Sequence, residues 1–152
     1  MIQLMSVVHD LDDIYYFTRS YDPFEIAFHL DFDIEYVDYL PGGRLGLAVP
    51  ELKVLFLVNT IKDTMYSYFI CAHELTHGTE HEGIQAFYNK SNRTKSRMEQ
   101  EADAGAIHIL CNYYLEEFPE IDRLNVPTVA SFFDLDEEFY SLIERELKGL
   151  ID

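Results

Sequence analysis

The segment His73-Glu74-Leu75-Thr76-His77 constrains this chain more than any other feature of its sequence. It lies in an apolar run that predicts a buried helix, and helical residues four apart lie one turn above each other. Both imidazoles can therefore bind one metal ion, with Glu74 beside the first ligand. This spacing is typical of zinc peptidases, in which the glutamate acts as general base. We therefore predict Zn²⁺ held by His73 and His77, with Glu74 as the catalytic base.

A catalytic zinc site needs a third protein ligand, and the segment 98–106 supplies the best candidates. Glu99 and Asp103 are four residues apart and continue into Ala106 and Leu110, so they share an apolar helical stripe. Carboxylates are costly to bury unless they are paired, and a metal with its imidazole ligands would pair them. The helical phase thus predicts Glu99 as the third ligand. Asp103 is predicted to accept a hydrogen bond from a ligand imidazole.

Glu99 has one structural alternative. Ser96 and Glu99 have the spacing of a capping box, in which the glutamate would cap the start of its helix. That alternative leaves Asp103 buried without a partner, so we favour the ligand assignment.

Three other polar residues near the motif are assigned lesser roles. Glu101 and His108 fall on the polar stripe of the Glu99 helix, and a structural or exposed position is expected for His108. His81 lies about 12 Å along a helix from His73, at about 1.5 Å per residue, which is too far for the same ion. A surface position, or one behind a ligand, is expected for His81.

A peptidase site also needs a group that stabilises the oxyanion, and a tyrosine or histidine is the usual choice. Tyr113 and Tyr114 both lie on the helix that carries Glu99. The sequence does not choose between these two tyrosines.

The charge of the chain restricts its partners. It has 28 acidic residues against 11 lysines and arginines, a formal net charge of −17. Such a surface repels nucleic acid and anionic lipid and attracts basic proteins. No signal peptide and no stretch of 18 apolar residues is found, which predicts a cytoplasmic protein without a membrane span. Cys71 and Cys111 lie in apolar helical patterns and are expected as free buried thiols.

The length of 152 residues and a hydrophobic content of 48% predict a single domain, residues 1–152. Helices are expected over residues 4–18, 22–30, 63–78, 96–117, 126–133 and 137–147, and strands over 34–39, 45–49 and 54–58. The predicted fold class is α+β. A small three-stranded, mostly antiparallel sheet packs against helices, with the motif helix at the centre.

Three motifs together resemble the ImmA/IrrE family of metallopeptidase-like proteins, which is found in phages, integrative elements and bacteria. They are Asp22-Pro23-Phe24-Glu25-Ile26-Ala27, Ala72-His73-Glu74-Leu75-Thr76-His77 and Glu99-Gln100-Glu101-Ala102-Asp103. The resemblance implies a gluzincin-like zincin core, with the two histidines on one helix. It also implies a metal-ligand role for Glu99, because the first glutamate of the third motif is the family's ligand.

The resemblance further implies a biological role. Many family members act on a helix-turn-helix repressor that is encoded nearby, and inactivate or cleave it to switch on phage, element or stress genes. A zinc endopeptidase acting on such a basic repressor is therefore the leading hypothesis. The alternatives are a metal-binding anti-repressor that sequesters its partner without cleaving it, and a toxin or general peptidase with another target.

Overall fold

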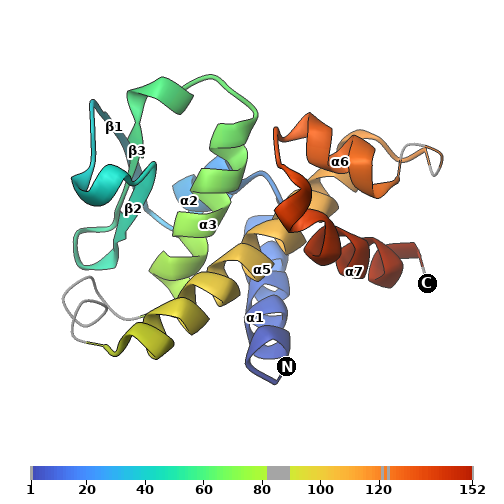
Figure 1. Ribbon diagram of the computed structural model, residues 1–152, viewed down its shortest axis with the longest axis horizontal. Coiled ribbons are helices and arrows are strands. Elements are labelled where there is room, and N and C mark those ends of the chain that lie inside the picture. The colour runs from blue at the N-terminus through green and yellow to red at the C-terminus, as the bar shows by residue number, and fades with distance from the viewer. Residues whose placement is uncertain (1, 82–89, 121, 123, 152) are drawn as a thin grey trace.

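A computed structural model describes residues 2–81, 90–120, 122 and 124–151. Figure 1 shows the sheet at one end of the molecule, followed by α3 and then by the long helix α5. The helices are α1 (Ile2–Thr18), α2 (Pro23–His29), α3 (Tyr66–Glu80), α5 (Asn92–Glu117), α6 (Val126–Phe132) and α7 (Tyr140–Ile151). The strands are β1 (Asp33–Val37), β2 (Gly46–Val49) and β3 (Val54–Val58). The predicted α+β class, with three strands and the motif helix in the middle, is confirmed.

The sheet is mixed and has the order β1-β3-β2. β2 and β3 are antiparallel, with Ala48 opposite Leu55, as expected for two strands joined by a short turn. β1 and β3 are parallel, with Ile34 opposite Leu55. The expectation of a mostly antiparallel sheet therefore holds for only one of the two pairings. β3 lies in the middle, where Leu55 and Leu57 are fully buried, and β2 is left at the edge beside α3.

Three boundaries of the two helices that carry the site, α3 and α5, differ from their predicted positions. α3 begins at Tyr66, because Asp63 adopts a positive φ of 64° and cannot serve as the cap. α3 also runs past Gly78 to Glu80. α5 begins at Asn92, where the hydroxyl of Ser91 accepts a hydrogen bond from the amide of Thr94.

α3 and α5 pack closely together around small side chains. Ala72 on α3 and Ala102 on α5 are fully buried. A Cβ atom placed on Gly105 would lie only 2.7 Å from Oγ1 of Thr76, so glycine is the residue that permits this approach. The hydroxyl of Thr76 donates to the carbonyl of Ala72 at 2.9 Å and is therefore satisfied in the contact.

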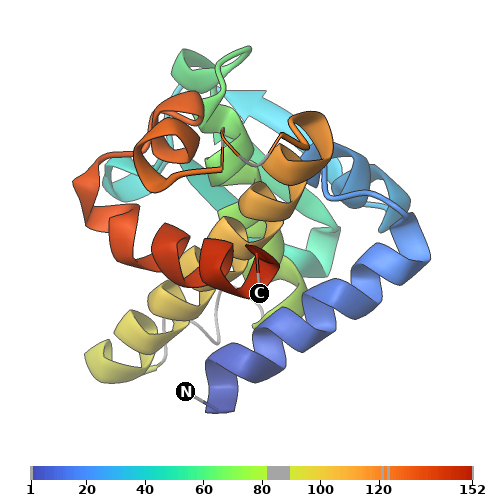
Figure 2. The ribbon, with the colours of Figure 1, turned by 90° about the vertical axis from the view of Figure 1, so that its right-hand side faces the viewer.

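Other faces of α5 are covered by α1 and by α7, which crosses in front of α5 in Figure 2. For this reason Glu101 and His108 are buried, with exposed fractions of 8% and 7%. Of the two alternatives left open for His108, structural or exposed, the structure shows the structural one. The helical pattern of α5 does not reveal that a central helix is covered on several faces.

Cys71 and Cys111 are buried and not joined in a disulfide, as predicted. In the part of the chain that the structure describes, no helix has the length and apolar character to cross a membrane.

Replacement of Gly105 by alanine is expected to lower the free energy of unfolding by about 1–3 kcal/mol, because the new methyl group overpacks the contact with Thr76. Gly149 is the matched control, since a Cβ there meets no atom within 4 Å. Gly149→Ala is expected to raise the stability by about 0.5–1 kcal/mol through helix propensity. Urea denaturation measures both changes, and equal effects of the two substitutions would contradict the packing account.

Candidate metal centre

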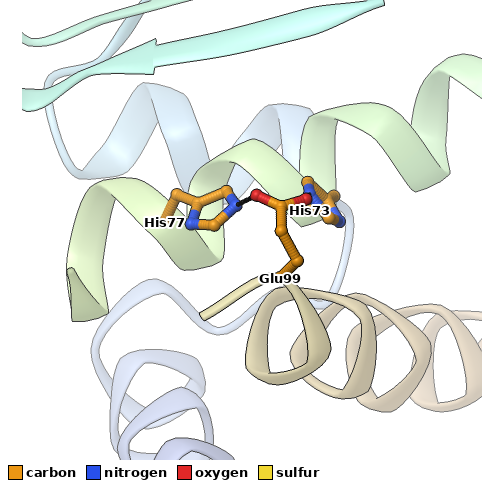
Figure 3. Close-up of side chains that lie close together, drawn as sticks. All are labelled: His73, His77 and Glu99. Atoms are coloured by element: carbon orange, nitrogen blue, oxygen red, sulfur yellow. Dashed lines mark hydrogen bonds and ion pairs between the residues drawn. The ribbon is translucent and has the colours of Figure 1, made fainter. Parts of the chain in front are cut away.

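His73 and His77 present their Nε2 atoms to one carboxylate from the neighbouring helix (Figure 3). The two residues are one turn apart on α3, and their ring centroids are 4.9 Å apart. Nε2 of His73 lies 3.2 Å from Oε2 of Glu99, and Nε2 of His77 lies 2.8 Å from Oε1. One ligand atom from each residue falls in a group whose members are all within 4.8 Å of one another. The three predicted ligands are thus brought together.

Glu99 reaches the histidines from the interior of α5. The helix is capped by Ser91, and Glu99 lies two turns further along. The capping-box alternative, with Ser96 at the start of the helix, is therefore wrong. The carboxylate of Glu99 is free to face α3, with 42% of its side chain exposed.

The Nδ1 atom of each ligand imidazole, which faces away from Glu99, makes a hydrogen bond. Nδ1 of His73 lies 2.9 Å from Oδ1 of Asp103, the contact that helical phase predicts. Because a carboxylate only accepts, His73 must carry its proton on Nδ1 and present Nε2 as a lone pair when it is neutral. Asp103 therefore fixes the tautomer that a metal ligand requires.

His77 is oriented by a two-residue relay. Its Nδ1 lies 2.7 Å from Nδ1 of His81, and Nε2 of His81 lies 3.1 Å from Oε1 of Glu101. The Glu101 carboxylate requires a proton on Nε2 of His81, so Nδ1 of a neutral His81 accepts from Nδ1–H of His77. His77 is then left with a lone pair on Nε2, toward Glu99.

This arrangement fits a cation. With these tautomers, two nitrogen lone pairs face two carboxylate oxygens, and only a proton or a metal ion can make the contacts attractive. Burial alone would lower the pKa of His73, but hydrogen bonds to Asp103 and Glu99 outweigh it and raise the pKa to about 10. Burial would raise the pKa of Glu99, yet hydrogen bonds from the two histidines hold it below its usual range. Two imidazoles and one carboxylate form a donor set that suits Zn²⁺.

Glu74 lies beside the cluster and is itself buried, with 5% of the residue exposed. Its Oε1 accepts a hydrogen bond from the amide of Ala48 at 3.0 Å, and its Oε2 lies 4.0 Å from Nε2 of His73. A Cβ on Gly46 would come within 2.8 Å of Cγ of Glu74, so strand β2 approaches the glutamate as closely as glycine allows. Burial raises the pKa of Glu74, while the nearby histidines and Arg44 lower it.

A pocket of about 190 Å³ opens at this point and is lined by Arg44, Leu45, Gly46, Phe69, Ile70, His73, Glu74 and Glu99. Neither tyrosine that was considered for the oxyanion belongs to this lining. Tyr114 is buried against Phe118, and Tyr113 packs against Tyr68. Arg44 is the cation that lines the pocket in the described part of the chain.

Sequence reasoning gave no role in the site to Arg44 or Glu101. For His81 it left two positions open, at the surface or behind a ligand, and the structure shows the second. The spacing of four between His77 and His81 was a usable signal, because it places both rings on the same face of α3. No local signal identifies Arg44, which reaches the site from the segment before β2.

Comparison with known proteins adds no relative to this description. No protein-family model matches the chain, and no match is found among curated proteins. The resemblance to the ImmA/IrrE family therefore rests on the three sequence motifs.

Zinc affinity is expected to rise with pH. At neutral pH the raised pKa of His73, about 10, keeps its imidazole protonated in the metal-free protein, so zinc must displace that proton. The apparent affinity should therefore increase about tenfold per pH unit between pH 6 and 8. Chelator competition at several pH values measures this slope. An affinity that is independent of pH would show that the imidazole is already neutral.

Loss of the relay behind His77 is expected to weaken zinc binding. His81→Ala removes the acceptor for Nδ1–H of His77 and should lower the affinity about 10–100-fold. His29→Ala is the matched control, because His29 is an exposed histidine at the end of α2. Equal zinc affinity of the two variants in the same competition assay would show that the relay does not orient the ligand.

Proposed function

We propose that the protein is a zinc-dependent endopeptidase whose substrate is a basic helix-turn-helix repressor. The proposal rests on one observation: the buried carboxylate of Glu74 is held next to a His73, His77 and Glu99 cluster, at the wall of an open pocket. A zinc ion, when bound by these three residues, would lower the pKa of a water molecule and polarise the scissile carbonyl.

Glu74 supplies the general base. The amide of Ala48 fixes its Oε1, which leaves Oε2 on the side of His73 to take up the proton of the attacking water. Burial raises the pKa of this carboxyl, which makes it a stronger base than an exposed glutamate. The same group can then deliver the proton to the leaving amine. Arg44 lines the same pocket, and its positive charge would stabilise negative charge on the carbonyl oxygen.

Strand β2 gives the substrate a place to bind. It is one of the two edge strands of the sheet, and it contributes Gly46 to the wall of the pocket. The amide of Ala48 points away from β3 toward Glu74, so this edge faces the candidate site. An extended peptide added along the edge would pass beside the catalytic carboxylate.

Two further observations support the substrate class. The net charge of −17 favours a basic partner and predicts salt-sensitive association. The motifs that resemble the ImmA/IrrE family favour a repressor as that partner, in the cytoplasm. The same site would also serve a protein that sequesters the repressor without cleaving it, so the experiment must separate these two functions.

Replacement of Glu74 by glutamine is the decisive test. Zinc-loaded protein is mixed with a helix-turn-helix repressor encoded beside it and with an unbiased peptide library, and products are identified by mass spectrometry. Glu74→Gln should lower cleavage at least about 10²-fold, because the general base is lost. Zinc content should stay near that of the wild type, since the three ligands are intact.

Glu80→Gln is the matched control, on the same helix but outside the pocket lining. It should cleave like the wild type. Release of intact repressor from DNA, equally with wild type and Glu74→Gln, would overturn the peptidase proposal and identify sequestration. Cleavage of the library without action on the repressor would instead point to a general peptidase.

A further inference from the structure

A second cavity, of about 660 Å³, lies between α1, α5 and α7 and shares no lining residue with the pocket beside Glu74. Its lining combines three tyrosine rings with three carboxylates, Asp12, Asp13 and Glu146. One arginine, Arg145, also lines it. Tyrosine faces next to carboxylates are the chemistry that binds planar cations.

A buried histidine bridges two of these three carboxylates, Asp12 and Glu146. His108, 7% exposed, lies with Nε2 2.7 Å from Oδ1 of Asp12 and with Nδ1 2.8 Å from Oε2 of Glu146. Both ring nitrogens must donate to carboxylates, which requires the imidazolium form. Burial would lower the pKa of His108, but Glu146 and Asp12 outweigh it and raise the pKa. One carboxylate from α1 and one from α7 are thus bridged by the imidazole ring of His108.

Each of these carboxylates keeps one oxygen available. Only Oδ1 of Asp12 and Oε2 of Glu146 take part in hydrogen bonds or ion pairs with the described residues. Oδ2 of Asp12 and Oε1 of Glu146 have no such contact within the described residues, and both side chains line the cavity. Two carboxylate oxygens in one cavity can share the N–H groups of a single ligand.

The tyrosines complete the walls. Tyr15 and Tyr21 are stacked with centroids 4.2 Å apart, and the hydroxyl of Tyr21 donates to Oδ1 of Asp12 at 3.1 Å. Tyr16 has 67% of its surface exposed, and the guanidinium of Arg19 already lies 5.8 Å from its ring centroid. The chain itself therefore already contains one contact between a guanidinium and a tyrosine ring in this region.

We propose that this cavity is a docking site for an arginine side chain of a basic partner protein. A guanidinium is planar, so it can stack on a tyrosine ring and donate to two carboxylates at once, whereas the ammonium of lysine is a compact point charge. The net charge of −17 attracts such a partner electrostatically. The site involves neither the metal ligands nor Glu74, so this proposal can be tested independently of the peptidase proposal.

The test uses the chain of residues 1–152 without metal and NMR titration with N-acetyl-arginine-methylamide. Binding is expected with a Kd on the order of 1 mM, as befits one small ligand. Shifts should centre on Tyr15, Tyr16 and Tyr21. The neutral citrulline analogue should not bind, and the lysine analogue should bind more weakly. A short peptide that carries the same arginine should bind more tightly than the free derivative.

Two charge-matched variants on α7 decide the outcome. Glu146→Gln should weaken binding about tenfold, because a charged hydrogen-bond acceptor is lost. Glu144→Gln should change it less than about twofold, since Glu144 is 59% exposed and pairs with Lys148 outside the cavity. Arg145→Ala should tighten binding by removal of a like charge. If Glu146→Gln unfolds, Tyr16→Ser, at an exposed position, should weaken binding in its place.

Equal effects of Glu146→Gln and Glu144→Gln would overturn the proposal. Citrulline binding as tight as that of the arginine derivative would also overturn it, and so would shifts confined to residues outside the cavity. If the peptide bound no more tightly than the free derivative, docking of a protein side chain would be excluded.

Discussion

The distance between α3 and α5 is the constraint on which the site depends. The two histidines lie on one helix and Glu99 on the other, so their contacts of 2.8 and 3.2 Å exist only while the helices stay close. Gly105 against Thr76 sets that distance, because any side chain at position 105 would meet Thr76. A contact of small residues well inside α5 thus determines whether Glu99 can reach both imidazoles.

Carboxylates orient the partly buried histidines of the candidate metal centre. Asp103 holds His73, and Glu101 holds His81 at the end of a relay. Such pairs are needed because an unpaired polar group is costly in a low-dielectric interior. These hydrogen bonds also have a chemical consequence. The acceptors fix the tautomers of His73 and His77, so that the Nε2 lone pairs of both rings face the carboxylate of Glu99. Part of the net negative charge of the chain is therefore built into its interior.

The sheet contributes to the candidate site by positioning one side chain, that of Glu74. β2 lies at its edge, and a single amide of that strand, from Ala48, orients the buried carboxylate of Glu74. The resemblance to the ImmA/IrrE family remains a prediction from the sequence, since no family model matches the chain.

The features of the site that depend on local periodicity could be predicted from the sequence. A helical period places His73 above His77, and the same period puts Glu99 and Asp103 on one face of α5. The fold class, the three strands and most helices could also be predicted, because amphipathic patterns and the glycines and prolines that interrupt them act within a few residues. Only the tertiary structure decided where those faces meet.

The sheet became mixed because β1 pairs with β3 in parallel, a long-range choice that no local pattern encodes. Glu101 and His108 are buried because helices cover several faces of α5, and Arg44 reaches the site from a distant segment. These features depend on how elements pack against one another, and the energy of packing is set by neighbours that are far away in the sequence.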